Sequence, residues 1–78
     1  MSLIAKKLIR EDRIKSIYAH LIDWTEKDVE IFKLNPYQYR FIQRDHIIDY
    51  FPTSGKYHDL NLNKWGFSHV FKLIELFT

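Results

Sequence analysis

Histidine and aspartate side chains gather in the second half of the chain, and these residue types bind metals or transfer protons. The residues concerned are His46, Asp49, His58, Asp59 and His69. A metal-dependent hydrolase around His46, Asp49 and His58 would use such imidazoles and carboxylates as ligands and bases. However, neighbouring side chains of a strand point to opposite faces, so His58 and Asp59 cannot readily share a metal. We therefore predict no metal site, no cofactor and no catalytic residue.

A predicted tight turn between Asp49 and His58 favours a structural pairing of these two side chains over a metal site. Residues 52–55 read Pro-Thr-Ser-Gly, in which proline presets φ and glycine takes a positive φ without strain. A loop of these four residues predicts three facing pairs: Phe51 with Lys56, Tyr50 with Tyr57, and Asp49 with His58. In this register we expect Asp49 and His58 to form a cross-strand ion pair.

Basic residues interleaved with aromatic ones offer a second chemistry, the binding of nucleic acid. Aromatic rings stack on bases while cations neutralise phosphates. The basic candidates lie in the N-terminal segment and near the predicted sheet: Lys6, Lys7, Arg10, Arg13, Arg40, Arg44, Lys56 and Lys64. The rings beside the sheet candidates are Tyr37, Tyr39, Tyr57 and Trp65. The alternative is that most of these rings build the core, since so small a domain has few other residues for it.

The N-terminal third has the spacing of an amphipathic helix. Apolar residues recur there every three or four positions: Ile14, Ile17, Tyr18, Leu21 and Ile22. We expect one long helix from near Ser2 to Trp24 with a frayed start; a start at Asp12, a good N-cap, is the alternative. A short second helix over residues 29–34 fits slightly better than a strand.

The middle of the chain predicts a three-stranded antiparallel sheet. In residues 37–42 the aromatic residues Tyr37, Tyr39 and Phe41 alternate with Gln38, Arg40 and Ile42. Residues 46–51 form the next predicted strand, and the third runs from residue 56 to residue 60 or 62. Asn61, Asn63 and Gly66 predict a loop. We expect Ser68 to cap a last helix. One face of that helix would hold Val70, Phe71, Ile74 and Phe77. The predicted class is α+β, with the helices covering one face of the sheet.

The composition of the chain limits the class of protein to which it can belong. The chain has 78 residues, of which 46% are hydrophobic and 17% aromatic, which indicates one folded domain spanning residues 1–78. It has no cysteine, which excludes disulfides and thiolate chemistry. No apolar run approaches the roughly 20 residues of a membrane span, and the N-terminus lacks a secretory signal pattern. We expect a cytoplasmic protein without a membrane partner. The net charge of +2 is small for a dedicated nucleic-acid binder.

The hairpin region also carries a resemblance. Residues 49–59 read DYFPTSGKYHD and residues 63–66 read NKWG, a pattern similar to that of short bacteriophage and prophage proteins. The resemblance covers residues 37–77 and implies a mobile-element origin and an intracellular host setting, with no catalytic residue to carry over.

These observations lead to a ranked set of functional hypotheses. The first is a non-enzymatic interaction module that binds a host protein or complex, with an anti-defence role as one version. Its candidate partner-binding residues are Lys56, His58, Asp59 and Trp65. The alternative is a small nucleic-acid-binding module, and a metal-dependent hydrolase comes third. A homodimer is compatible with all three.

Overall fold

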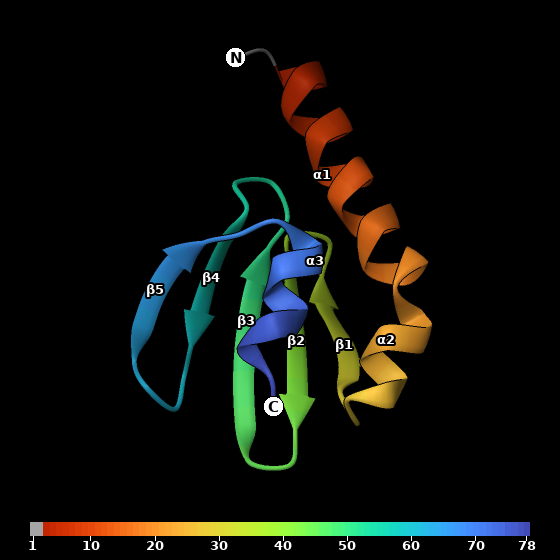
Figure 1. Ribbon diagram of the computed structural model, residues 1–78. Coiled ribbons are helices and arrows are strands. Elements are labelled where there is room, and N and C mark those ends of the chain that lie inside the picture. The colour runs from red at the N-terminus through yellow and green to blue at the C-terminus, as the bar shows by residue number, and fades with distance from the viewer. Residues whose placement is uncertain (1–2) are drawn as a thin grey trace.

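A five-stranded antiparallel sheet with helices on one face forms the molecule, as seen in the computed structural model, which describes residues 3–78 (Figure 1). The helices are α1 (Leu3–Ala19), α2 (Leu21–Glu26) and α3 (Val70–Leu73), the last continued by a 3₁₀ turn, η1 (Ile74–Leu76). The strands are β1 (Glu30–Asn35), β2 (Gln38–Gln43), β3 (His46–Phe51), β4 (Lys56–Asp59) and β5 (Lys64–Phe67). Each strand pairs with the next one along the chain.

The α+β class is confirmed, but the prediction of three strands is wrong because β1 and β5 add one strand at each edge. Residues 29–34, expected as a helix, contain most of β1 instead. Ile31 pairs with Phe41 of β2 and packs against the core, whereas Phe32 is exposed on the other face. Apolar residues on both faces hide the alternation that marks a strand.

Strand β5 replaces the loop predicted around Gly66. The ring of Tyr57 lies over this glycine, where an added Cβ would come within 2.7 Å of the ring atoms. Gly66 therefore makes room for a side chain of the neighbouring strand, and it does not break the strand.

The predicted long N-terminal helix is interrupted at His20, between α1 and α2. The interruption turns Trp24 into the core, where its indole N–H donates a 3.0 Å hydrogen bond to the carbonyl of Ile17. The expected start at Ser2 lies outside the described residues. None of the helices over residues 3–78 has the length and apolar character to cross a membrane.

The C-terminal helix is shorter than predicted and begins differently. Its N-cap residue is His69, and the Ser68 hydroxyl donates to the His69 carbonyl, so Ser68 is not the cap. Val70 and Phe77 are buried as expected, but Phe71 is 52% exposed. Ile74 is also buried, and Leu73 takes the place of Phe71 on the buried face.

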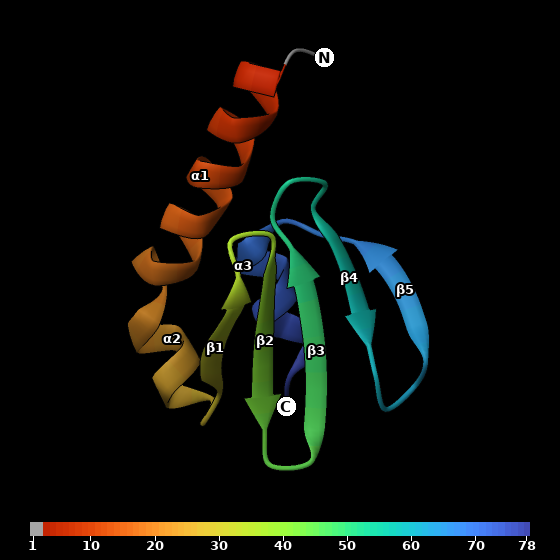
Figure 2. The ribbon, with the colours of Figure 1, turned by 180° about the vertical axis from the view of Figure 1, so that it is seen from behind.

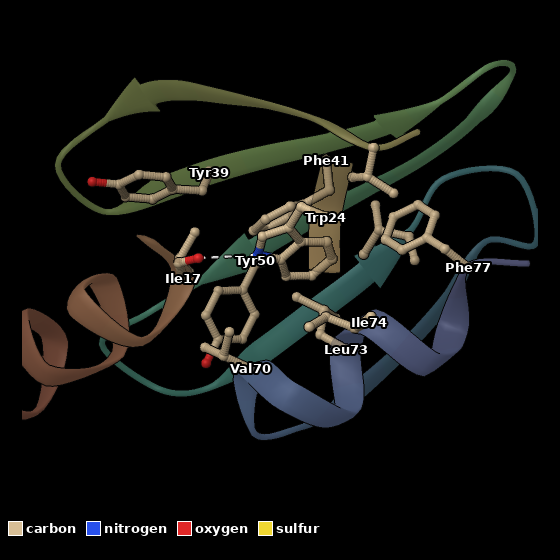
Figure 3. Packing of buried hydrophobic residues seen from close by; sticks show 11 residues of the cluster. Ile17, Trp24, Tyr39, Phe41, Tyr50, Val70, Leu73, Ile74 and Phe77 are labelled. Atoms are coloured by element: carbon tan, nitrogen blue, oxygen red, sulfur yellow. Dashed lines mark hydrogen bonds between the residues drawn. The ribbon is translucent and has the colours of Figure 1, made fainter. Parts of the chain in front are cut away.

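The core lies between the inner face of the sheet and the helices (Figure 3). Its buried side chains are Ile17, Trp24, Val29, Tyr39, Phe41, Ile48, Tyr50, Val70, Leu73, Ile74 and Phe77. Trp24 stacks on Phe41 at a centroid distance of 4.7 Å and meets Phe77 edge-on at 6.1 Å. Most of the aromatic residues from the centre of the sheet are thus used in folding.

The register predicted for the central hairpin is confirmed. The pairs are Phe51 with Lys56, Tyr50 with Tyr57, and Asp49 with His58. Gly55 has a φ of 76° in the connecting turn, a conformation that glycine adopts without strain. This register decides which side chains share the uncovered face of the sheet.

Candidate functional site

The outer face of the sheet, opposite the core, has no helix of residues 3–78 lying over it (Figure 2). Residues paired across antiparallel strands share a face, so the register aligns one outward side chain from each strand. This row consists of Phe32, Arg40, Asp49, His58 and Trp65. We name it the outer ladder. It runs from an aromatic ring through charged groups to another aromatic ring.

The centre of the outer ladder is an ion pair. Arg40 donates from Nε to Oδ1 of Asp49 at 2.8 Å and from Nη2 to Oδ2 at 3.0 Å. Gln38 also donates to Oδ2, at 3.0 Å, and Asp49 is only 4% exposed. The hydrogen bond to Asp49 raises the pKa of the Arg40 guanidinium. Burial opposes this rise, and the negative charge of Asp49 adds to it. The charges of Arg40 and Asp49 at the centre of this face therefore neutralise each other.

An aromatic cluster forms the β5 end of the outer ladder. The rings of His58 and Trp65 stack with a centroid distance of 3.9 Å and an interplanar angle of 3°. Lys56 places its Nζ 4.6 Å from the centre of the Trp65 ring, a cation–π contact. The ring centres of Phe51 and Trp65 are 6.1 Å apart. His58 is fixed further, because its Nε2 donates to Oδ1 of Asn63 at 3.0 Å. Trp65 is held by its neighbours while about half of its surface stays exposed.

Two aromatic residues of the outer face were not predicted as site residues. Phe32 lies in the segment expected to be helical, and Phe67 follows the expected loop at Gly66. Phe32 is 43% exposed and Phe67, which pairs with Lys56, is 74% exposed. The alternation of Trp65 and Phe67 around Gly66 is the sequence signal that would have indicated β5.

The structure brings together three of the four predicted partner-binding residues. Lys56, His58 and Trp65 lie in the aromatic cluster, whereas Asp59 points to the opposite face because it is adjacent to His58 in a strand. The predicted ion pair between Asp49 and His58 is not formed, although the two residues are paired in register. Asp49 binds Arg40 instead, since a guanidinium offers a bidentate partner.

Asp59 has a structural role at the end of β4. It is 5% exposed, and its carboxylate accepts hydrogen bonds from Nε2 of His46 at 2.7 Å and from the amides of Asn61 and Leu62 at 3.1 Å each. Burial raises the pKa of Asp59, but these hydrogen bonds outweigh it and lower the pKa below 3.8. The folded state therefore favours the ionised carboxylate.

Replacing Asp59 with asparagine is expected to destabilise the fold by about 1–3 kcal/mol at neutral pH, because buried donors lose a charged acceptor. The lowered pKa makes this contribution fully present above the pKa of the unfolded chain, and it is lost as the pH falls through the folded pKa. Urea unfolding of Asp59→Asn and wild type at a series of pH values measures the difference. The two curves should converge in acid, and a constant gap would contradict this account. Asp45→Asn, in an exposed turn, is the matched control.

The histidine and aspartate residues do not assemble a metal site. Within residues 3–78, no three of the His, Asp and Glu side chains are placed so that they could hold one metal ion. His46 binds Asp59 on the inner side, whereas Asp49 and His58 lie on the outer face with other partners. His69 stacks on Phe71 beside α3.

The predicted nucleic-acid residues are distributed over separate parts of the molecule. Arg40 is bound to Asp49, Arg10 lies 4.7 Å from the ring centre of Tyr37, and Arg13 donates to the carbonyls of Pro52 and Thr53. Lys56 lies in the aromatic cluster, and the other candidates are exposed at the N-terminal half of α1, the β2–β3 turn and the start of β5: Lys6, Lys7, Arg44 and Lys64.

The rings proposed for base stacking are divided in the same way. Tyr39 is buried in the core, and Tyr57 lies on the inner face against Gly66. Tyr37 is exposed in the β1–β2 turn, and only Trp65 of the four lies on the outer face. Comparison with family models, with curated proteins and with solved structures finds no match to this chain.

Proposed function

We propose that this chain is a non-enzymatic binding module that holds a partner protein on the outer face of its sheet. The observation that carries the proposal is the arrangement of the outer ladder. Exposed aromatic rings stand at both ends, and the charged groups between them are already paired. Trp65 is held in a fixed orientation by His58 and Lys56, so little side-chain entropy is lost when a partner covers it. Protein interfaces concentrate their binding energy in such partly exposed aromatic residues.

The charge pattern favours a protein over nucleic acid. The outer face carries Glu30 and Asp49 against Arg40 and Lys56, so its formal charge is balanced. Nucleic-acid affinity depends on clustered cations that neutralise phosphates, and the exposed lysines of α1 lie on a helix that does not cover this face (Figure 2). As part of the same proposal we take the chain to be of phage or prophage origin, on the hairpin pattern of residues 49–59, and we propose a host protein as the partner.

Alanine replacement of Trp65 or Phe32 is expected to weaken binding of a purified partner at least tenfold, which corresponds to about 1.4 kcal/mol per site. The partner would first be identified with a photoreactive residue placed at position 67, which is exposed on the same face beside Trp65, in the full chain in bacterial lysate. Affinities are then measured by calorimetry. Ile22→Ala is the matched control, because Ile22 is 75% exposed on α2, away from the outer face.

Two results would overturn the proposal. One is a partner that binds the Trp65→Ala/Phe32→Ala double variant as tightly as it binds wild type. The other is submicromolar binding of single-stranded DNA or RNA that weakens along a log–log salt line and is lost in Trp65→Ala, which would establish the nucleic-acid alternative. Fluorescence anisotropy at low and physiological salt measures the second.

A further inference from the structure

The two edges of the sheet differ in how their backbone groups are protected. At the β1 edge the ladder shifts register between Lys33 and Asn35, Pro36 follows the strand, and α2 lies alongside (Figures 1 and 2). A shifted register, charged side chains and a nearby proline are devices that prevent edge strands from pairing with other chains. The β5 edge has none of them between Trp65 and Phe67, where the sequence is Trp-Gly-Phe.

The hydrogen-bond alternation shows which groups of β5 face outward. The amide of Leu60 donates to the carbonyl of Ile47, so alternate residues of β4, including Lys56 and His58, bond to β3. The intervening residues of β4 therefore bond to β5. The amide of Ser68 donates to the carbonyl of Gly55 at 2.9 Å, which places β5 in the same alternation.

It follows that Gly66 directs its N–H and C=O toward β4, whereas Trp65 and Phe67 direct theirs away from the sheet. The side chains of Trp65 and Phe67 both lie on the outer face, and they are 49% and 74% exposed. This edge thus combines unpaired backbone donors and acceptors with two exposed aromatic rings. Such a combination is a template for adding another strand.

We propose that β5 pairs antiparallel with β5 of a second copy of this chain, joining the two sheets into one. The outward groups dictate the register: Trp65 lies opposite Phe67 of the second copy, and the two Gly66 residues meet at the two-fold axis. Each Trp65 then faces a Phe67 on the same surface, a favourable cross-strand aromatic pair.

A second copy suits this edge because the edge is complementary to itself. In the same register Lys64 lies opposite Ser68, so no like charges meet. The glycines at the axis bring no side chains that would clash between the two strands. The inference does not rest on the proposed function, since it depends on the backbone and the two aromatic rings of β5 and needs no partner protein on the outer face.

The test measures self-association of the full chain by sedimentation equilibrium, from micromolar to millimolar concentration. We expect a monomer–dimer equilibrium that Phe67→Pro weakens at least tenfold, because proline removes an outward N–H and is tolerated at a strand edge. Phe67→Lys, which keeps the backbone N–H but loses the aromatic pair, should also weaken it. Phe71→Ala is the matched control, since Phe71 is a similarly exposed aromatic residue on α3.

Amide hydrogen exchange of the wild-type chain provides a readout that does not depend on any variant folding. The amides of Trp65 and Phe67 should become protected as concentration rises, whereas the amide of Gly66 should be protected throughout. A chain that stays monomeric at millimolar concentration would overturn the proposal. So would a dimer in which the amides of Trp65 and Phe67 still exchange quickly, because that dimer uses another surface.

Discussion

Replacing Trp24 with alanine is expected to destabilise the fold by about 3–5 kcal/mol, the usual cost of truncating a buried aromatic side chain. Trp24 is 1% exposed, stacks on Phe41 and meets Phe77 edge-on. Its indole N–H also satisfies the carbonyl of Ile17, next to the interruption between α1 and α2. A domain of this size has a total stability of roughly 4–12 kcal/mol, so the substitution removes a large share of it.

Urea unfolding followed by circular dichroism measures this effect. Trp24→Phe is the matched comparison, because it keeps an aromatic ring against Phe41 but loses the hydrogen bond to Ile17. It should cost clearly less than Trp24→Ala. A loss below about 1 kcal/mol for Trp24→Ala would contradict the central place that the structure assigns to this residue.

Breaking the ion pair between Arg40 and Asp49 is expected to cause the second-largest loss of stability. The loss should depend strongly on which of the two partners is replaced. Arg40→Met leaves the carboxylate of Asp49 almost fully buried with only Gln38 as a side-chain donor, at a cost of about 2–3 kcal/mol. Asp49→Asn should cost less, about 1 kcal/mol, because the Arg40 side chain is 35% exposed and reaches water.

The double variant Arg40→Met/Asp49→Leu separates the pair interaction from the penalty of a buried charge. Removing both partners leaves no unpaired charge, so the double variant should be more stable than Arg40→Met alone. Urea unfolding of the three variants and wild type completes the cycle. If Arg40→Met costs no more than Asp49→Asn, the carboxylate is better solvated than the structure indicates.

Local signals in the sequence were sufficient for the central hairpin. Residues 52–55 have a proline and a glycine at the positions where a turn requires them, and this turn sets the pairing of Asp49 with His58. Alternation in residues 37–42 correctly indicated β2. The same alternation also predicted that His58 and Asp59 point to opposite faces, which removes Asp59 from the candidate site.

The edge strands β1 and β5 could not be predicted from local sequence patterns, because the patterns of their residues are compatible with more than one structure. Residues 29–34 have apolar side chains on both faces, which suits a helix as well as a strand until β2 is present to pair with Ile31. Gly66 is unfavourable in a strand by intrinsic propensity, but the ring of Tyr57 fills the space that a side chain would occupy. As a result Phe32 and Phe67 were missed as residues of the outer face.

The sequence by itself determined the α+β class and the register of the central hairpin, because these depend on turn geometry and on side-chain alternation within a few residues. Only the tertiary structure decided which partner Asp49 takes, which rings are buried and which face of the sheet stays open. Those outcomes depend on contacts between residues far apart in the chain, such as Trp24 with Phe77. The spacing of residues along the chain does not predict these contacts, because many tertiary packings are compatible with the same local pattern.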